Sequence, residues 1–505
     1  MTTVIKLSPQ QTAFLDWIKN GVGSCVLIAV AGAGKTFSLV KAIELLKGST
    51  AVLAFNKKIA DEIGEKIAHV ASALAGTVHS FGFRALGKAY GKIKVDGYKV
   101  NNLVQDLILN DRPDLKPYEA AIVKLVGYAK QRALGVIGSI DDDSAWFDII
   151  VHFDVFADVD EDEENPIPQE EVVRVARLIL NKSNKITNVV DFDDMVYLPT
   201  FLNVPMNRFD NVLVDEAQDT NAARRALVRA LLKPNGRLVA VGDPCQAIYG
   251  FTGADNDSLD LIKRDFDAIE LPLIVTYRCP KAVVSFAQQW VSHIEAAETA
   301  PEGSVGNVEM VDFMARKDLD GSSVVLCRLT APIVELAFKL IRQRVPCKVE
   351  GRDVGKSLEK LATRWKVKNT ADLIDKLIEW KETEKTKLLA RKQETKAQHV
   401  DDTVETLLVI IENVNAEGKH SIKDVVTAID GLFADGEKKI LTLSTIHKSK
   451  GREWKNVFWY DRISTCPSKY ARQAWQKDQE RNLMYVAATR AKANLFDLAK
   501  LPKVA

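Results

Sequence analysis

The chain has 505 residues, with 69 Lys and Arg against 68 Asp and Glu, and 47% of its residues are hydrophobic. Because this length exceeds what a single hydrophobic core supports, we expect several domains. The composition argues against a disordered or fibrous protein. The net charge of +1 neither supports nor excludes nucleic acid as a partner, since a balanced total can hide a basic groove.

The six cysteines are scattered, with no C-x-x-C pair and no histidine at ligand spacing from any of them. This pattern is typical of reduced thiols in a cytosolic compartment. The first residues, MTTVIKLSPQQ, lack the apolar core of a signal peptide, and no stretch of the sequence is apolar over the 18 residues that a membrane span needs. We therefore expect a cytoplasmic protein with no membrane partner.

Short apolar runs alternate with helical periodicity in two regions, which is typical of parallel sheets covered by helices. The strands expected in the first region are 25–30, 50–55, 211–216 and 237–243. Those expected in the second region are 323–329, 439–447, 456–461 and 494–499. Mainly helical segments interrupt both regions, at 85–185 and 352–437. The sequence thus predicts two α/β lobes, each with an inserted helical subdomain.

The stretch AVAGAGKT, residues 29–36, follows the first expected strand and precedes a helical pattern. Backbone N–H groups at a glycine-containing turn that leads into a helix form a concave anion site. Lys35 would reach the β and γ phosphates of a nucleotide, and Thr36 would hold Mg²⁺. Ala29 stands where the general phosphate-loop pattern begins with Gly, a small departure because the turn can still form.

The stretch VLVDEAQD places two carboxylates at the end of another expected strand of the same lobe. Asp215 suits coordination of Mg²⁺, and Glu216 suits a general base for an attacking water. An acidic pair after a strand is weak evidence alone, but together with the phosphate loop it predicts nucleotide hydrolysis.

The chain resembles the UvrD/Rep-type superfamily 1 DNA helicases, because the motifs of that family occur in order along it. In the first lobe they are LSPQQ (7–11), AVAGAGKT, FNKKIADEI (55–63), GTVHSF (76–81), DFDDM (191–195), VDEAQDT (214–220) and VGDPCQAIYGFTGAD (241–255). In the second lobe they are TYRCP (276–280), STIHKSKGREW (444–454) and ERNLMYVAATRAK (480–492). The family's phosphate loop often begins with Ala, which accounts for Ala29.

The resemblance implies the fold class and the site residues. It implies two RecA-like parallel-sheet domains, 1A (1–84 and 186–270) and 2A (271–351 and 438–505), with helical insertions 1B (85–185) and 2B (352–437). The residues implied for catalysis are Lys35, Asp215, Glu216, Gln246, Arg278 and Arg490, with the metal on Thr36 and Asp215. Those implied for ATP binding are Gln11, Ala31, Gly32, Ala33, Gly34, Lys35, Thr36, Phe37, Tyr277, Gly451 and Glu453. Those implied for DNA contact are Phe55, Asn56, Lys57, Thr77, His79, Phe81, Tyr249, Phe251 and His447.

The resemblance further implies a monomeric, ATP- and Mg²⁺-dependent motor on single-stranded DNA and on junctions of single and double strands. Travel from 3′ to 5′ and unwinding of duplexes rest on the resemblance alone. Two alternatives remain open: a RecD-type helicase of the opposite polarity, and a translocase that strips proteins from DNA without separating strands. Replication, repair or recombination proteins are the expected protein partners, and association with the nucleoid is the expected location in a bacterium or phage.

Overall fold

The computed structural model describes residues 7–159, 166–248, 250, 257–390, 394–433, 440–471 and 473–499. The chain forms two compact units. Unit 1 contains residues 1–29 and 34–274, and unit 2 contains residues 30–33 and 275–505. Among the described residues, no helix combines the length and the apolar character needed to cross a membrane.

Unit 1 is built on a six-stranded sheet with the order β3-β2-β6-β7-β1-β8, in which every neighbouring pair is parallel. The strands are β1 (Cys25–Ala29), β2 (Thr50–Ala54), β3 (Ala73–Thr77), β6 (Phe209–Val214), β7 (Leu232–Gly242) and β8 (Ile269–Leu273). Strand β2 is buried along its whole length and β1 along nearly all of it. Such continuous burial is expected where helices cover both faces of a parallel sheet.

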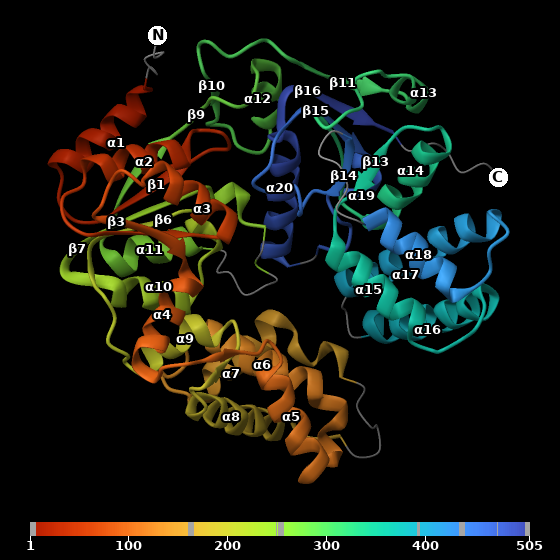
Figure 1. The fold of residues 1–505 in the computed structure, drawn as a ribbon, viewed down its shortest axis with the longest axis horizontal. Helices are drawn as coiled ribbons and strands as arrows, with labels where there is room; N and C mark the ends of the chain where they lie inside the picture. The colour runs from red at the N-terminus through yellow and green to blue at the C-terminus, as the bar shows by residue number, and fades with distance from the viewer. Residues whose placement is uncertain are drawn as a thin grey trace. The chain divides into compact units, whose positions relative to one another are not determined.

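The helices of unit 1 fall into two groups (Figure 1). The sheet is accompanied by α1 (Pro9–Asn20), α2 (Lys35–Leu45), α3 (Lys57–Lys66), α4 (Val78–Tyr90), α9 (Asp194–Phe201), α10 (Ala222–Leu231) and α11 (Ser258–Phe266). The inserted helices are α5 (Lys99–Asn110), α6 (Glu119–Gln131), α7 (Asp143–Phe153) and α8 (Gln169–Lys185). The inserted helices pack on one another around Leu125, Trp146 and Ile179, and this hydrophobic core continues into α4 and α9.

Unit 2 repeats this plan with a second six-stranded parallel sheet, ordered β11-β16-β15-β12-β14-β13. The strands are β11 (Ser304–Val308), β12 (Ser323–Cys327), β13 (Cys347–Val349), β14 (Leu441–Thr445), β15 (Trp454–Tyr460) and β16 (Ala491–Leu498). The helices are α12 (Lys281–Ala287), α13 (Met310–Met314), α14 (Thr330–Arg342), α19 (Arg462–Thr465) and α20 (Ala474–Ala488), with α15 (Arg352–Thr363), α16 (Thr370–Ala390), α17 (Glu394–Ala416) and α18 (Ile422–Phe433) inserted.

The insertion of unit 2 is attached to its sheet by a helix cap. The carboxylate of Asp402, on α17, accepts hydrogen bonds from the backbone N–H groups of Thr330 (2.9 Å) and Ala331 (2.8 Å) at the start of α14. These N–H groups have no partner within their own helix, so a carboxylate there satisfies them and complements the helix dipole. The predicted fold class, two RecA-like parallel-sheet domains with mainly helical insertions, is confirmed, and so are all eight expected strands.

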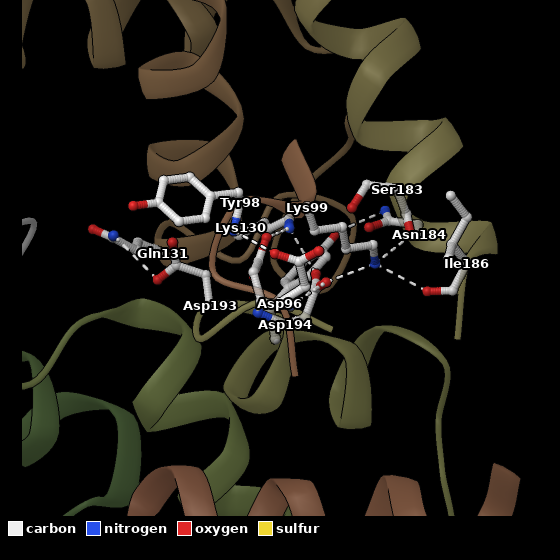
Figure 2. A network of polar contacts seen from close by, with 12 residues as sticks. Asp96, Tyr98, Lys99, Lys130, Gln131, Ser183, Asn184, Ile186, Asp193 and Asp194 are labelled. Carbon is white, nitrogen blue, oxygen red and sulfur yellow. Dashed lines mark hydrogen bonds and ion pairs between the residues drawn. The ribbon is translucent and has the colours of Figure 1, made fainter. Parts of the chain in front are cut away.

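A buried network of charges joins the insertion of unit 1 to its sheet (Figure 2). Asp194, at the start of α9, pairs with Lys99 of α5 through Oδ2 (2.7 Å) and with Lys130 of α6 through Oδ1 (2.7 Å). Lys130 also pairs with Asp191 at 2.6 Å. Burial alone would lower the pKa of Lys130, but Asp194 and Asp191 outweigh it and raise that pKa. The network therefore keeps a lysine charged in the interior of the protein.

We expect Lys130→Ala to lower the free energy of unfolding by about 3 to 5 kcal/mol, because it leaves two buried carboxylates without their shared cation. The side chain of Lys130 is fully buried. The shift of the urea midpoint measures this loss. The matched control is Lys116→Ala, which removes a 67% exposed lysine paired with Glu119 and should cost about 1 kcal/mol or less. Equal shifts in the two variants would contradict the account of the network.

Candidate functional site

The turn between β1 and α2 has the geometry of an anion-binding loop. Gly32 and Gly34 have positive φ angles of 75° and 81°, a conformation that glycine adopts without strain. Gly34 is the N-cap of α2, and no side chain in the described part of the chain caps that helix end. Lys35, Thr36 and Phe37 form the first turn of α2, while Ala31 and Ala33 are buried. The start of α2 therefore presents backbone donors and a positive dipole end to a negative ligand.

Gln11 lies against this loop from α1. Its Oε1 accepts a hydrogen bond from the backbone N–H of Ser8 (3.0 Å), and the Ser8 hydroxyl accepts one from the N–H of Gln11 (3.1 Å). This capping box fixes the acceptor end of the Gln11 side chain. The amide nitrogen faces Gly34, where an added Cβ would lie 3.1 Å from Nε2. The predicted adenine-reading residue is thus held beside the loop by the cap of its own helix.

The two predicted carboxylates meet the lysine of the loop at the carboxyl end of the sheet. Lys35 Nζ lies 3.7 Å from Glu216 Oε1. Glu216 has a φ of 51°, which is uncommon for a non-glycine residue. Asp215 is buried and accepts a hydrogen bond from the N–H of Glu216 (3.0 Å). Burial, and then the charge of Glu216, raise the pKa of Asp215, while Lys35 lowers it.

Two further side chains, which the sequence did not single out, connect Glu216 to Gln246. Gln218 donates a hydrogen bond from Nε2 to Glu216, and its Oε1 accepts one from the backbone N–H of Asp243 (3.1 Å). The carboxylate of Asp243 in turn accepts a hydrogen bond from Gln246 Nε2 (2.6 Å). The predicted base and the predicted phosphate sensor are therefore linked by a continuous chain of hydrogen bonds.

The charges around Lys35 suit a divalent cation. The group contains three carboxylates, those of Asp215, Glu216 and Asp243, and the ammonium of Lys35. Burial is the main cause that raises the pKa values of Asp215 and Asp243; the charge of Glu216 raises them further, and the charge of Lys35 lowers them. Within the described ranges, no three His, Cys, Asp or Glu side chains converge as a complete metal cage. This donor set fits Mg²⁺, which is commonly held by one or two carboxylates together with water and substrate phosphates.

The residues predicted to contact DNA from unit 1 differ in their surroundings. Phe55 follows β2 and is 37% exposed. Asn56 and Thr77 cap α3 and α4, accepting hydrogen bonds from the N–H groups of Ile59 (2.9 Å) and Ser80 (3.1 Å). Lys57 is exposed on the first turn of α3. Asn56 and Thr77 thus have a local structural role whatever else they bind.

His79 and Phe81 lie on the first turn of α4. Burial and the charge of Arg224 lower the pKa of His79 to about 4, so its imidazole is neutral at neutral pH. Phe81 is buried and packs edge-on against Phe209, with the ring centroids 5.9 Å apart. Tyr249 and Phe251, the predicted stacking residues after Gln246, lie outside the described residues.

In unit 2, the two predicted arginines are both engaged by partners of the same unit. Arg278 Nε donates to Glu453 Oε2 (2.6 Å), and Lys492 pairs with the other oxygen of Glu453 (3.0 Å). Arg490 is buried and donates to the carbonyls of Val486 (3.0 Å) and Arg452 (3.1 Å). Their guanidinium groups are therefore held in fixed positions before any ligand arrives.

The other predicted residues of unit 2 differ in their surroundings. Tyr277 is 47% exposed, and Gly451 has a positive φ of 79°. Burial and then the charge of Arg328 lower the pKa of His447 to about 3, so His447 is also neutral. A neutral imidazole can exchange hydrogen bonds with a strand but adds no positive charge to the binding surface.

Two family models match the chain. The UvrD/REP helicase N-terminal domain matches residues 9–267, about half of the chain, and the UvrD-like helicase C-terminal domain matches residues 354–498. The chain belongs to the UvrD/Rep helicase family. The predicted family is thereby confirmed, and both matches include site residues described above.

The UvrD/Rep-family chain is similar to several curated helicases. The ATP-dependent DNA helicase Rep of Escherichia coli K12 is 27% identical over 305 residues, which are 53% of this chain and 40% of that protein. The ATP-dependent DNA helicase PcrA of Staphylococcus aureus Mu50 is 24% identical over 325 residues, 59% of this chain and 41% of that protein. The chain thus aligns with about two fifths of the length of these relatives.

Proposed function

We propose that this UvrD/Rep-family chain is a DNA-dependent ATPase that moves along single-stranded DNA from 3′ to 5′ and separates duplex strands. The observation that carries the proposal is the grouping of Lys35, Asp215 and Glu216, which follow β1 and β6 at the carboxyl end of a parallel sheet. Ligands of open α/β sheets bind at that edge. The names of the relatives, ATP-dependent DNA helicases, support ATP and DNA as the ligands.

In this proposal, the phosphates of ATP bind at the start of α2 and draw Lys35 away from Glu216. Glu216 is then available to accept a proton from the attacking water, and Gln218 keeps it oriented. Thr36 and Asp215 would hold Mg²⁺, which supplies positive charge to the phosphate oxygens when bound. Arg278 and Arg490 are proposed to act on the γ-phosphate. The sheets of the two units are proposed to be motor domains 1A and 2A, and segments 85–185 and 352–437 to be insertions 1B and 2B.

A paired unwinding assay tests this function. The full chain is given Mg-ATP and a duplex with either a 3′ or a 5′ single-stranded tail, with a blunt duplex as the control for end fraying. We expect faster strand separation on the 3′-tailed duplex. A preference for the 5′ tail would contradict the polarity, and ATP hydrolysis stimulated by single strands without any separation would favour the protein-stripping translocase.

A further inference from the structure

Arg224 lies where the nucleotide side and the proposed strand side of unit 1 meet. It is the third residue of α10, whose N-cap Asn221 accepts a hydrogen bond from the N–H of Arg224 (3.0 Å). Its Nη1 donates to the carbonyl of Asp219 (2.7 Å), and its Cζ lies 5.8 Å from the ring centroid of Phe55. One guanidinium group thus contacts both the turn after Glu216 and an aromatic ring predicted to bind DNA.

The turn that Arg224 holds is short and directly follows the proposed base. It is the 3₁₀ turn Ala217–Asp219, and Glu216, with its left-handed backbone, is the N-cap of that turn. A hydrogen bond to the last carbonyl of this turn therefore restrains the segment that orients Glu216. A shift of the guanidinium by a fraction of an ångström would reach Glu216 through only three residues.

Arg224 contributes a positive charge at this place. Burial lowers the pKa of Arg224, while Asp219 and Asp193 raise it, and an arginine stays charged in a protein interior. Its charge contributes to keeping His79 neutral. Asp193 is the residue that Figure 2 shows beside Gln131, whose Nε2 donates to it (3.2 Å). Arg224 is thus in electrostatic contact with two sequence motifs besides its own, those that contain His79 and Asp193.

A small cavity connects the same groups. Its lining includes Phe55, His79, Glu216, Asp219 and Arg224, and its volume is about 20 Å³, room for about one water molecule. Phe55 and Glu216 therefore face a common space, so movement of the ring changes the surroundings of the carboxylate.

We infer that Arg224 is a positioning residue that couples strand binding at Phe55 to the orientation of Glu216. The inference rests on the proposed function, since it requires Phe55 to contact DNA. A base that stacks on Phe55 would displace the ring relative to the guanidinium, and Arg224 would pass that displacement to the turn through Asp219. This gives single-stranded DNA a route by which it accelerates ATP hydrolysis.

The test compares ATP hydrolysis with and without saturating oligo(dT) in Arg224→Ala and Arg224→Gln. Glutamine keeps an amide donor for the Asp219 carbonyl but removes the charge and the ring contact. We expect the ratio of stimulated to basal turnover to fall by about fivefold or more in both variants, the low end of usual coupling between two sites. The matched control is Arg229→Ala on the same helix, whose guanidinium stacks 4.5 Å from the centroid of the Phe266 ring and which should keep the ratio.

Three results would overturn the inference. One is an unchanged ratio in both variants while the unaltered chain is stimulated by DNA. Another is a loss in Arg224→Ala that Arg224→Gln does not share, which would assign the effect to the hydrogen bond alone. The third is a large loss of oligo(dT) affinity in which the slope of log affinity against log salt concentration falls by about one. That result would make Arg224 a direct phosphate contact. If the unaltered chain is not stimulated at all, the proposed function itself is wrong.

A double variant checks the route through the ring. If Arg224 and Phe55 act in series, Phe55→Leu combined with Arg224→Ala should lower the stimulation ratio no further than the stronger single variant does, because coupled residues are not additive. Measurement at saturating oligo(dT) removes any difference in strand affinity. Losses that multiply would show independent effects and contradict the coupling.

Discussion

Glu216→Gln is expected to reduce ATP turnover by about 10²- to 10⁴-fold, the usual contribution of a general base, while nucleotide binding persists. Glutamine has nearly the same shape and can still contact Gln218, but it cannot accept a proton from water. Asp215 and Lys35 remain in place to hold the metal and the phosphates. Single-turnover hydrolysis measures the rate of ATP hydrolysis, and titration with a fluorescent ATP analogue measures nucleotide affinity.

The control for this prediction is Glu62→Gln, which changes a glutamate with a 53% exposed side chain, paired with Lys58 on α3. It should leave both quantities unchanged. If Glu216→Gln lost nucleotide affinity in proportion to turnover, Glu216 would serve ground-state binding, and its assignment as the base would be wrong.

Lys35→Ala is expected to reduce turnover by about 10²- to 10³-fold, the usual cost of removing one preorganised group that stabilises transition-state charge. Unlike Glu216→Gln, it should also weaken nucleotide binding, because the lysine contacts the phosphates in the ground state as well. Binding of single-stranded DNA without nucleotide should persist, since the residues proposed for strand contact lie on other elements. Steady-state hydrolysis measures turnover, the fluorescent ATP analogue measures nucleotide affinity, and filter binding of oligo(dT) measures strand binding.

Lys41→Ala is the matched control for Lys35→Ala, because Lys41 lies on the same helix with a 43% exposed side chain paired with Glu44. It should retain full turnover. Full turnover in Lys35→Ala itself would remove the assignment of the phosphate loop.

The strands that could be predicted from sequence are those with buried, apolar runs. Within the two six-stranded sheets, the four strands that were not predicted, β3, β8, β11 and β13, are the edge strands. An edge strand has one unpaired side and less burial, so its sequence need not be apolar throughout. β11, with the sequence SVGNV, is mostly exposed, and β8 contains Pro272, which is tolerated at an edge.

The site was predictable where chemistry and local spacing coincide, as for Lys35, Asp215 and Glu216. The roles of Gln218 and Asp243 were not, because they depend on hydrogen bonds between β6 and β7 that bring two distant motifs together. Arg224 was missed for another reason. Nothing in the sequence distinguishes it from the other arginines of α10, and only the fold brings it to Phe55.

In the proposed function, the chain couples ATP hydrolysis to single-stranded DNA. Steady-state ATP turnover of the full chain, measured with Mg²⁺ over a titration of oligo(dT), tests it most directly, with Lys35→Ala as the blank for contaminating ATPases. We expect turnover to rise to a plateau with oligo(dT) and to disappear when Mg²⁺ is chelated. Turnover that is independent of oligo(dT), or equal to that of Lys35→Ala, would contradict it.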